Sequence, residues 1–245
     1  AIGYLAHSAN TTGEGNITIG YKAGNDLTTA NYNICIGYEA GSQATTEGTC
    51  TYIGRKAGQK ATGSQECTVV GGSAAWELVD GDKNVLMGNM SGRSLTSGSY
   101  NTAIGYASLY AATNAEYNTA VGYQSLIANT TGYHNVALGA NTLTTTTTGW
   151  GNVAVGHEAL KLNTTGDENT AVGWQAGTAH TTADGNTYIG KRAGYSNTTG
   201  SENTTVGKNS LYYTTTGNYN SALGLGALYN NTTASNNTAV GYLAL

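Results

Sequence analysis

The sequence predicts an all-β fold, a parallel β-solenoid of about fifteen coils with seventeen residues in each coil. Three observations support this prediction. A glycine recurs every seventeen residues from Gly3 to Gly241 without insertion or deletion, and the same residue types recur around each of these glycines. Proline is absent from all 245 residues. Because proline cannot donate a backbone hydrogen bond, its absence is typical of a chain that is paired along its whole length.

The repeat is numbered here so that this glycine occupies position 5, as Gly105, Gly122, Gly139 and Gly156 do in the centre of the chain. Position 4 is always Ile, Val, Leu or Met, and position 13 is Thr in thirteen of fourteen coils. Position 1 is usually Asn, and these side chains are predicted to hydrogen-bond along the stack. Central examples of this asparagine are Asn118, Asn135, Asn152 and Asn169. Such fixed columns indicate that each residue lies above its counterpart in the next coil.

The unit is too short for a pair of packed helices, since helical repeats need thirty residues or more. Positions 2 to 6 alternate a β-branched residue, a small residue, an aliphatic residue, glycine and often tyrosine, which is typical of a strand. Thr-Thr-Gly at positions 13 to 15 then indicates a turn. The coil is therefore predicted to contain one short strand and several turns.

The sizes of the residues at positions 3 and 9 vary inversely. Where position 9 is Leu, position 3 is Ala or Thr, and where position 9 is Gly, position 3 is usually larger, as at Tyr52 and Leu86. Two side chains that share one space produce this pattern. We expect position 4, for example Val121, to fill the coil interior. Position 3 would then face outward, and Ala120 with Leu126 would form a second apolar side covered by other copies of the chain.

Residues 1–245 read as one array, because no linker or change of composition interrupts it. Ala1 falls at position 3 and Leu245 at position 9, and no polar cap is visible at either end, so we expect a segment of a longer fibre. Only 10% of the residues are charged, and the basic ones are few. The chain is therefore predicted neither to bind nucleic acid nor to insert into a membrane, since it also lacks a long apolar run.

Few residues suggest chemistry. The four histidines occupy four different positions of the repeat, so no catalytic, cofactor or metal site is predicted and the chain is not expected to be an enzyme. Glu77, Asp80 and Asp82 lie near a glycine and could form either a cation site or an ordinary acidic turn. Asp167 and Asp184 share position 16 in adjacent coils, where they would repel each other unless water or a cation screens them.

The cysteines leave two alternatives open. Cys50 and Cys67 both occupy position 1 in successive coils, which places their Cα atoms within the range of a disulfide. They could equally be two buried thiols that replace Asn in its column. Cys35 lies at position 3 and has no cysteine within reach in its own chain.

Aromatic residues supply the strongest hint of recognition. Tyr195, Tyr212 and Tyr229 share position 10 in three successive coils, with Tyr213 beside them. Exposed tyrosines suit sugars as well as proteins, so these four are a candidate glycan-contact ladder. The alternative is that the rings only stabilise neighbouring coils. The threonines at positions 13 and 14 suggest an ice-binding face, although only one of two adjacent columns can point outward.

The strands NTAIG, NTAVG, NVAVG and TYIG, each followed by a small residue at position 8, resemble the repeats of trimeric autotransporter adhesin heads. They are even more similar to the NTAVGYxALxxNTTG arrays of tail-fibre proteins. The resemblance covers all fifteen coils and implies a left-handed β-roll, three chains around one axis, and an extracellular place on a virion or cell surface. Our first hypothesis for the function is a structural, homotrimeric fibre shaft of a phage-type tail fibre or surface adhesin, which presents a receptor-binding tip. The alternatives are an adhesin module that binds a cell-surface glycan or receptor and an ice-binding solenoid.

Overall fold

The computed structural model describes residues 1–46 and 48–245, which form two compact units, residues 1–120 and 121–245. Each unit is built from short parallel strands and turns, and no helix occurs among the described residues. The predicted all-β solenoid is therefore confirmed. The strands of the N-terminal unit are β1 (Ile17–Ile19), β2 (Ile34–Ile36), β3 (Thr51–Ile53), β4 (Thr68–Val70), β5 (Val85–Met87) and β6 (Thr102–Ile104). β7 (Thr119–Val121) lies at the division. The C-terminal unit holds β8 (Val136–Leu138), β9 (Val153–Val155), β10 (Thr170–Val172), β11 (Thr187–Ile189), β12 (Thr204–Val206), β13 (Ser221–Leu223) and β14 (Thr238–Val240).

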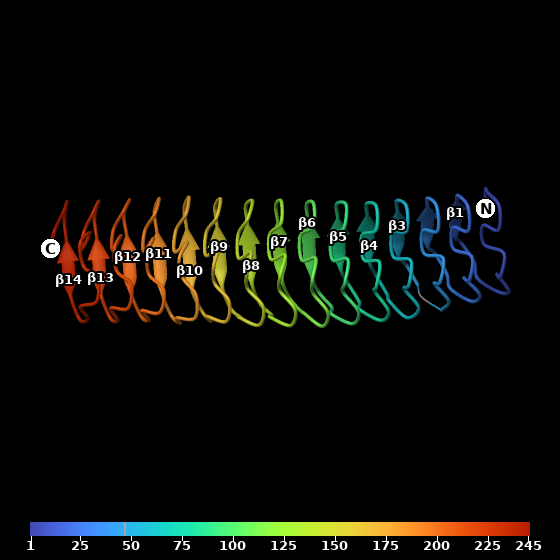
Figure 1. Ribbon diagram of the computed structural model, residues 1–245. Coiled ribbons are helices and arrows are strands. Elements are labelled where there is room, and N and C mark those ends of the chain that lie inside the picture. Colours follow the sequence, from blue (N-terminus) through green and yellow to red (C-terminus); the bar gives the residue numbers. More distant parts are fainter. Residues whose placement is uncertain (47) are drawn as a thin grey trace. The chain divides into compact units, whose positions relative to one another are not determined.

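Strand pairing follows the repeat. Within each unit every strand pairs in parallel with the strand of the next coil, as Figure 1 shows for β8 to β14. The partners lie one repeat apart, for example Thr170 with Thr187. An isolated bridge between Ile2 and Ile19 adds the first coil of the N-terminal unit. A slip of one residue would turn every side chain to the other face, so this constant register explains why the columns of the sequence are strict.

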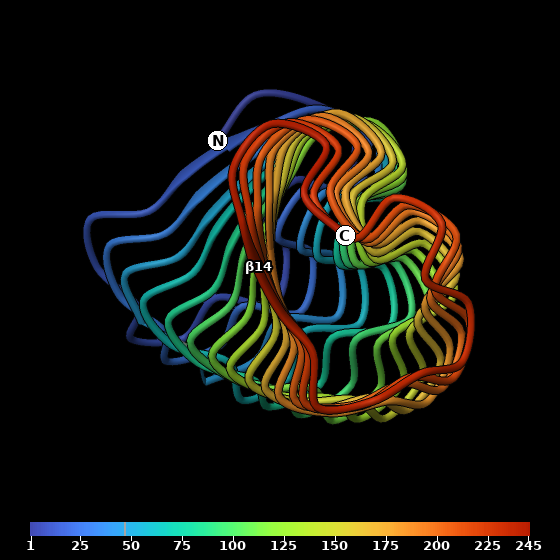
Figure 2. The same cartoon turned by 90° about the vertical axis from the view of Figure 1, so that its left-hand side faces the viewer.

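Outside the strand, the backbone of each coil changes direction at residues with positive φ. In the C-terminal unit, Figure 2 shows successive coils following nearly the same outline, with the strand on one side and an inward bend of the backbone opposite it. Positions 7, 9 and 17 have positive φ in most coils, and in one coil these are Glu158 (58°), Leu160 (47°) and Glu168 (57°). L-residues adopt this region at a cost, which the hydrogen bonds to neighbouring coils offset here.

The glycine at position 5 is required by the distance between coils. Gly122, Gly139 and Gly156 have φ of 138°, 134° and 125°, and Gly105 has 134°. A Cβ added to Gly139 would lie 2.7 Å from the carbonyl oxygen of Gly156, which is closer than any real Cβ contact. The recurring glycine therefore marks the place where backbones of adjacent coils approach most closely.

The prediction about which face is inside was wrong. Position 3 fills the interior: Ala120 and Ala137 are completely buried. Position 4 points outward instead, and Leu138 is 46% exposed. Alternation along the strand puts positions 1 and 3 on one side and positions 2 and 4 on the other, but it does not say which side is enclosed. The buried leucines of position 9, such as Leu126, already occupy most of the thin interior, which leaves room only for small residues at position 3.

The predicted trade between positions 3 and 9 is confirmed, with both residues inside the coil. A Cβ added to Gly92 would lie 2.9 Å from both Cδ atoms of Leu86. Likewise a Cβ on Gly177 would lie 2.7 Å from the ring of Tyr188 and 2.9 Å from Leu160. A large residue at position 3 thus takes the volume that a position-9 leucine fills elsewhere.

The asparagine column forms the predicted ladder. Asn135, Asn152 and Asn169 are completely buried. The backbone N–H of Asn152 donates to Oδ1 of Asn135 at 3.0 Å, and Nδ2 of Asn152 donates to the same oxygen at 3.1 Å and to the carbonyl oxygen of Gly166 at 2.9 Å. In the N-terminal unit the N–H of Asn118 donates to Oδ1 of Asn101 at 3.0 Å. Each amide is satisfied without water, so the column joins successive coils.

The cysteines are buried free thiols. Cys50 and Cys67 replace asparagine in this ladder, and the N–H of Cys67 donates to Sγ of Cys50 at 3.4 Å. The Cys50 thiol donates in turn to the carbonyl oxygen of Ser64 at 3.4 Å. Of the two alternatives, the structure therefore has the pair of thiols and not the disulfide.

Candidate functional site

The outer face of the sheet is uncharged and open, and position 4 gives it one aliphatic side chain in every coil. It is formed by positions 2 and 4, which carry only Ile, Val, Leu, Met, Thr and Ser in all fourteen strands. In the C-terminal unit Val172 is 37% exposed, Ile189 40% and Leu223 51%. Single exposed apolar residues are ordinary, but a row with one such residue in each coil of a unit is of the kind that marks an interaction site.

The end of this face is hollowed in the C-terminal unit. Strands β12 to β14 surround a depression of about 280 Å³ on the outer side of the sheet. The residues that line it are Thr204, Val206, Ser221, Ala222, Leu223 and Val240. The small Ser221 at position 2 leaves this space, and the larger position-4 side chains form its walls. An aliphatic side chain from outside would fit such a hollow.

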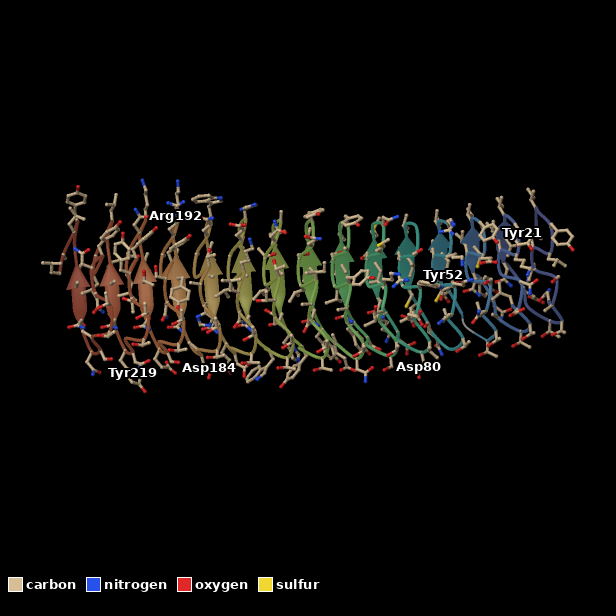
Figure 3. The ribbon with its side chains drawn as sticks, in the orientation of Figure 1. Tyr21, Tyr52, Asp80, Asp184, Arg192 and Tyr219 are labelled. Atoms are coloured by element: carbon tan, nitrogen blue, oxygen red, sulfur yellow. The ribbon has the colours of Figure 1, made fainter. Side chains whose placement is uncertain are left out.

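Charges are separated on the two sides of the sheet. Nine of the ten Lys and Arg residues fall at positions 6, 7, 10 and 11, whereas ten of the fourteen Asp and Glu residues fall at positions 14 to 17. In the C-terminal unit we call Lys191, Arg192 and Lys208, which follow β11 and β12, the basic edge. We call Asp167, Glu168, Asp184 and Glu202, which precede β10 to β12, the acidic edge. Figure 3 shows Arg192 beyond one end of the strands and Asp184 beyond the other.

The acidic edge is stabilised by the backbone. Oδ1 of Asp167 accepts the N–H of Trp150 at 2.9 Å, and Oδ1 of Asp184 accepts the N–H of Asp167 at 2.8 Å. In the N-terminal unit Asp82 accepts the N–H of Gln65 in the same way, at 2.8 Å. Position 16 is therefore a column of acceptors, and a hydrogen bond to each carboxylate offsets the repulsion expected between neighbouring aspartates.

The basic edge combines cations with an aromatic ring. Nζ of Lys191 and the guanidinium of Arg192 each lie 4.6 Å from the centre of the Trp174 ring. Nε of Arg192 donates to Gln175 at 2.9 Å, and Gln175 donates to Glu158 at 2.7 Å. The hydrogen bond from Gln175, and then that from a lysine, lower the pKa of the Glu158 carboxyl. This network fixes Arg192 within the chain and leaves Lys191 exposed.

The candidate glycan ladder exists, but its rings cover one another. The ring centres of Tyr195 and Tyr212 lie 5.0 Å apart and those of Tyr212 and Tyr229 5.2 Å apart, with interplanar angles of 9° and 17°. Tyr213 meets Tyr212 edge to face at 4.8 Å. A sugar stacks on an open ring face, which Tyr212, the middle ring, does not offer. The geometry therefore favours stabilisation of neighbouring coils.

The threonine columns behave as two different surfaces. The hydroxyl of Thr164 at position 13 donates to the carbonyl oxygen of Thr181 at 3.0 Å, and Thr181 donates to Thr198 at 2.9 Å. Position 14 is exposed, as at Thr165 and Thr182. Only one of the two columns thus points to solvent, as predicted.

The residues considered for chemistry remain apart. Among residues 1–46 and 48–245 no three His, Cys, Asp or Glu side chains form a group that could hold a metal ion. Glu77 forms an ion pair with Lys60 at 2.5 Å, and Asp82 accepts a hydrogen bond from the backbone N–H of Gln65. The acidic turn around Asp80 therefore does not form a cation site. The described chain also has no helix with the length and apolar character needed to span a membrane.

The sequence reading missed the two charged edges, although their signal was present. Charges considered one by one are few and scattered along the chain, but they separate once they are sorted by repeat position.

Comparison with protein-family models finds no match, and no curated protein or solved structure matches the chain.

Proposed function

We propose that this chain is the structural shaft of a homotrimeric, extracellular fibre, either a phage-type tail fibre or a surface adhesin, which presents a receptor-binding tip. The observation that carries the proposal is the open aliphatic face of the sheet, with Ile189 and Leu223 as representative members. A parallel sheet is normally covered on both faces, and here one face packs on the coil interior while the other is exposed.

A second copy of the chain is the partner that fits this face best. Every coil contributes one aliphatic side chain at position 4, so another copy presents the same row at the same spacing. Side chains of two copies can interdigitate in each coil, whereas a partner with a different period would match only over a few coils. Burial contributes about 25 cal/mol per Å² of apolar surface, and this contact is repeated along each unit.

The internal bonding supports a mechanical role. The asparagine ladder, the close glycine contacts and the stacked tyrosines all join one coil to the next. Contacts of this kind resist bending and unfolding. We therefore assign the chain a structural role and no catalytic one.

Native mass spectrometry of the wild-type segment tests this proposal. We expect a complex of three chains, each of 25.1 kDa. Val172→Asp combined with Ile189→Asp should give monomers with an unchanged far-UV circular dichroism spectrum, because burying these carboxylates in the interface is unfavourable. Leu162→Asp is the matched control, since Leu162 is 42% exposed at position 11, outside the sheet. A folded wild-type monomer at micromolar concentration would contradict the proposal.

A further inference from the structure

The charges beside the sheet determine how two copies can meet. The outer face of β11 and β12 carries no charge, but it has the basic edge on one side and the acidic edge on the other. We propose that neighbouring copies associate in parallel, with Lys191 and Lys208 of one copy against Asp184 and Glu202 of the next. This inference rests on the self-association proposed above and adds its polarity and its ionic contacts.

The four residues are available for contacts between copies. Lys191, Lys208, Asp184 and Glu202 are all exposed. Among the described residues the ion pairs of the chain involve other side chains, namely Glu39, Lys56, Lys60, Glu77, His157, Glu158 and Lys161. The Glu202 carboxylate lies beside Gly185, where an added Cβ would be 2.8 Å from Oε1. Its charge is thus free to meet a cation from outside.

The geometry distinguishes parallel from antiparallel association. When copies related by rotation about the stacking direction turn their sheets toward one shared axis, the basic edge of each copy lies beside the acidic edge of the next. When one copy is reversed, basic edge meets basic edge and acidic edge meets acidic edge. Like charges in contact cost free energy, so the separated edges select the parallel arrangement.

The register follows from the coils. Asp184 and Lys191 flank the same strand, β11, and Glu202 and Lys208 flank β12. A parallel neighbour at equal height therefore brings opposite charges together in two successive coils. The N-terminal unit has one such coil, at β1, where Glu14 precedes the strand and Lys22 follows it. An unshifted parallel contact is thus compatible with both units taken separately.

Charge exchange at one pair tests the proposal. Lys208→Glu and Glu202→Lys should each weaken association roughly tenfold at low salt, as like charges then meet in every interface. The double variant Lys208→Glu/Glu202→Lys should regain wild-type association, because the pair is restored with its signs exchanged. Raising the salt concentration should reduce the differences between all four proteins. Glu168→Lys serves as a control for change of net charge, since its coil has no lysine in the basic edge.

The orientation is read by carbodiimide cross-linking of mixed ¹⁴N and ¹⁵N chains. Activation of the Glu202 carboxyl, followed by attack of the Lys208 amine, forms an amide and releases the urea of the reagent. A mixed-isotope Glu202–Lys208 peptide is expected for parallel copies. If the wild type is monomeric, the proposed function fails. If it assembles but the single variants associate as the wild type does, or the mixed-isotope peptide is absent, this inference is overturned while self-association stands.

Discussion

The Tyr188 hydroxyl lies 3.4 Å from Nδ1 of His180, and both side chains are completely buried inside the C-terminal unit. Nε2 of His180 lies 2.8 Å from the carbonyl oxygen of Ala183, which can only accept. Nε2 must therefore carry the proton, and Nδ1 accepts from Tyr188. The Tyr188 oxygen accepts in turn from Nδ2 of Asn197. Every member of this buried chain is satisfied only while the imidazole is neutral.

Acid should therefore destabilise the C-terminal unit. Burial lowers the pKa of His180 from 6.5 to about 4, although the backbone carbonyl of Ala183 and the carboxylate of Asp184 act in the other direction. The unfolded chain then binds more protons than the folded one, so stability falls as pH decreases from 6.5 to 4. The loss amounts to about 3 kcal/mol at the lower limit. Urea unfolding at pH 7 and at pH 4 measures it.

His180→Asn is the matched variant for this prediction. Asparagine at the same position bonds to the backbone elsewhere, and Asn231 does so with Ala234 at 3.0 and 3.1 Å. The variant should lose less stability between pH 7 and pH 4 than the wild type, whereas His157→Asn at an exposed site should behave as the wild type. Equal acid sensitivity of His180→Asn and wild type would show that other groups cause the effect.

Exchange of volume between positions 3 and 9 should be tolerated when both residues change. Leu86→Ala leaves a cavity and should lower the free energy of unfolding by about 2 to 5 kcal/mol. Gly92→Leu alone should be destabilising, because its Cβ would meet Leu86 at 2.9 Å. The double variant Leu86→Ala/Gly92→Leu has the combination found in other coils, Ala at position 3 and Leu at position 9. Leucine is accepted at position 9 with positive φ, since Leu160 has a φ of 47° there. The stability of the double variant should lie near that of the wild type, and a double-mutant cycle with no coupling would contradict the shared space.

The glycine column should not accept even one methyl group. In Gly54→Ala the added Cβ would lie 2.6 Å from the carbonyl oxygen of Gly71, at a φ of 132°. We expect a loss of at least about 2 kcal/mol in the free energy of unfolding. Gly63→Ala is the control in the same unit, since its Cβ would meet Asp80 at an ordinary 3.6 Å. Thermal unfolding of both proteins decides the matter, and similar midpoints would refute the explanation.

Restoring asparagine at the two cysteines should strengthen the ladder. The Sγ atom of Cys50 is a weak acceptor for the N–H of Cys67, at 3.4 Å, whereas Oδ1 of Asn33 accepts the N–H of Cys50 at 2.9 Å. Cys50→Asn/Cys67→Asn should therefore raise the free energy of unfolding by about 1 kcal/mol per site. The reciprocal change Asn84→Cys should lower it. Denaturant titration under reducing conditions compares the variants, and a less stable double variant would contradict the prediction.

Much of the fold was predictable because stacking imposes one rule on every coil. The close approach at Gly139, the amide ladder through Asn152 and the shared volume of Leu86 and Gly92 each require the same residue type, or the same compensating pair, at a fixed period. The strand was predicted too long, since only positions 2 to 4 are paired as strand. The left-handed residues, such as Leu160 and Glu168, were not predicted, although their columns hold glycine in other coils, as at Gly177 and Gly185, which have positive φ as well.

By itself the sequence determined the period, the parallel register and the columns that join the coils, since residues that stack on their own copies must repeat. Only the tertiary structure decided which side of the strand is enclosed. Alternation separates Ala137 from Leu138, but the path of the other residues in the coil selects the side that Leu143 fills. The same path sets the basic edge at one end of the strands and the acidic edge at the other, because residues distant within a repeat become neighbours of the sheet only when the coil closes.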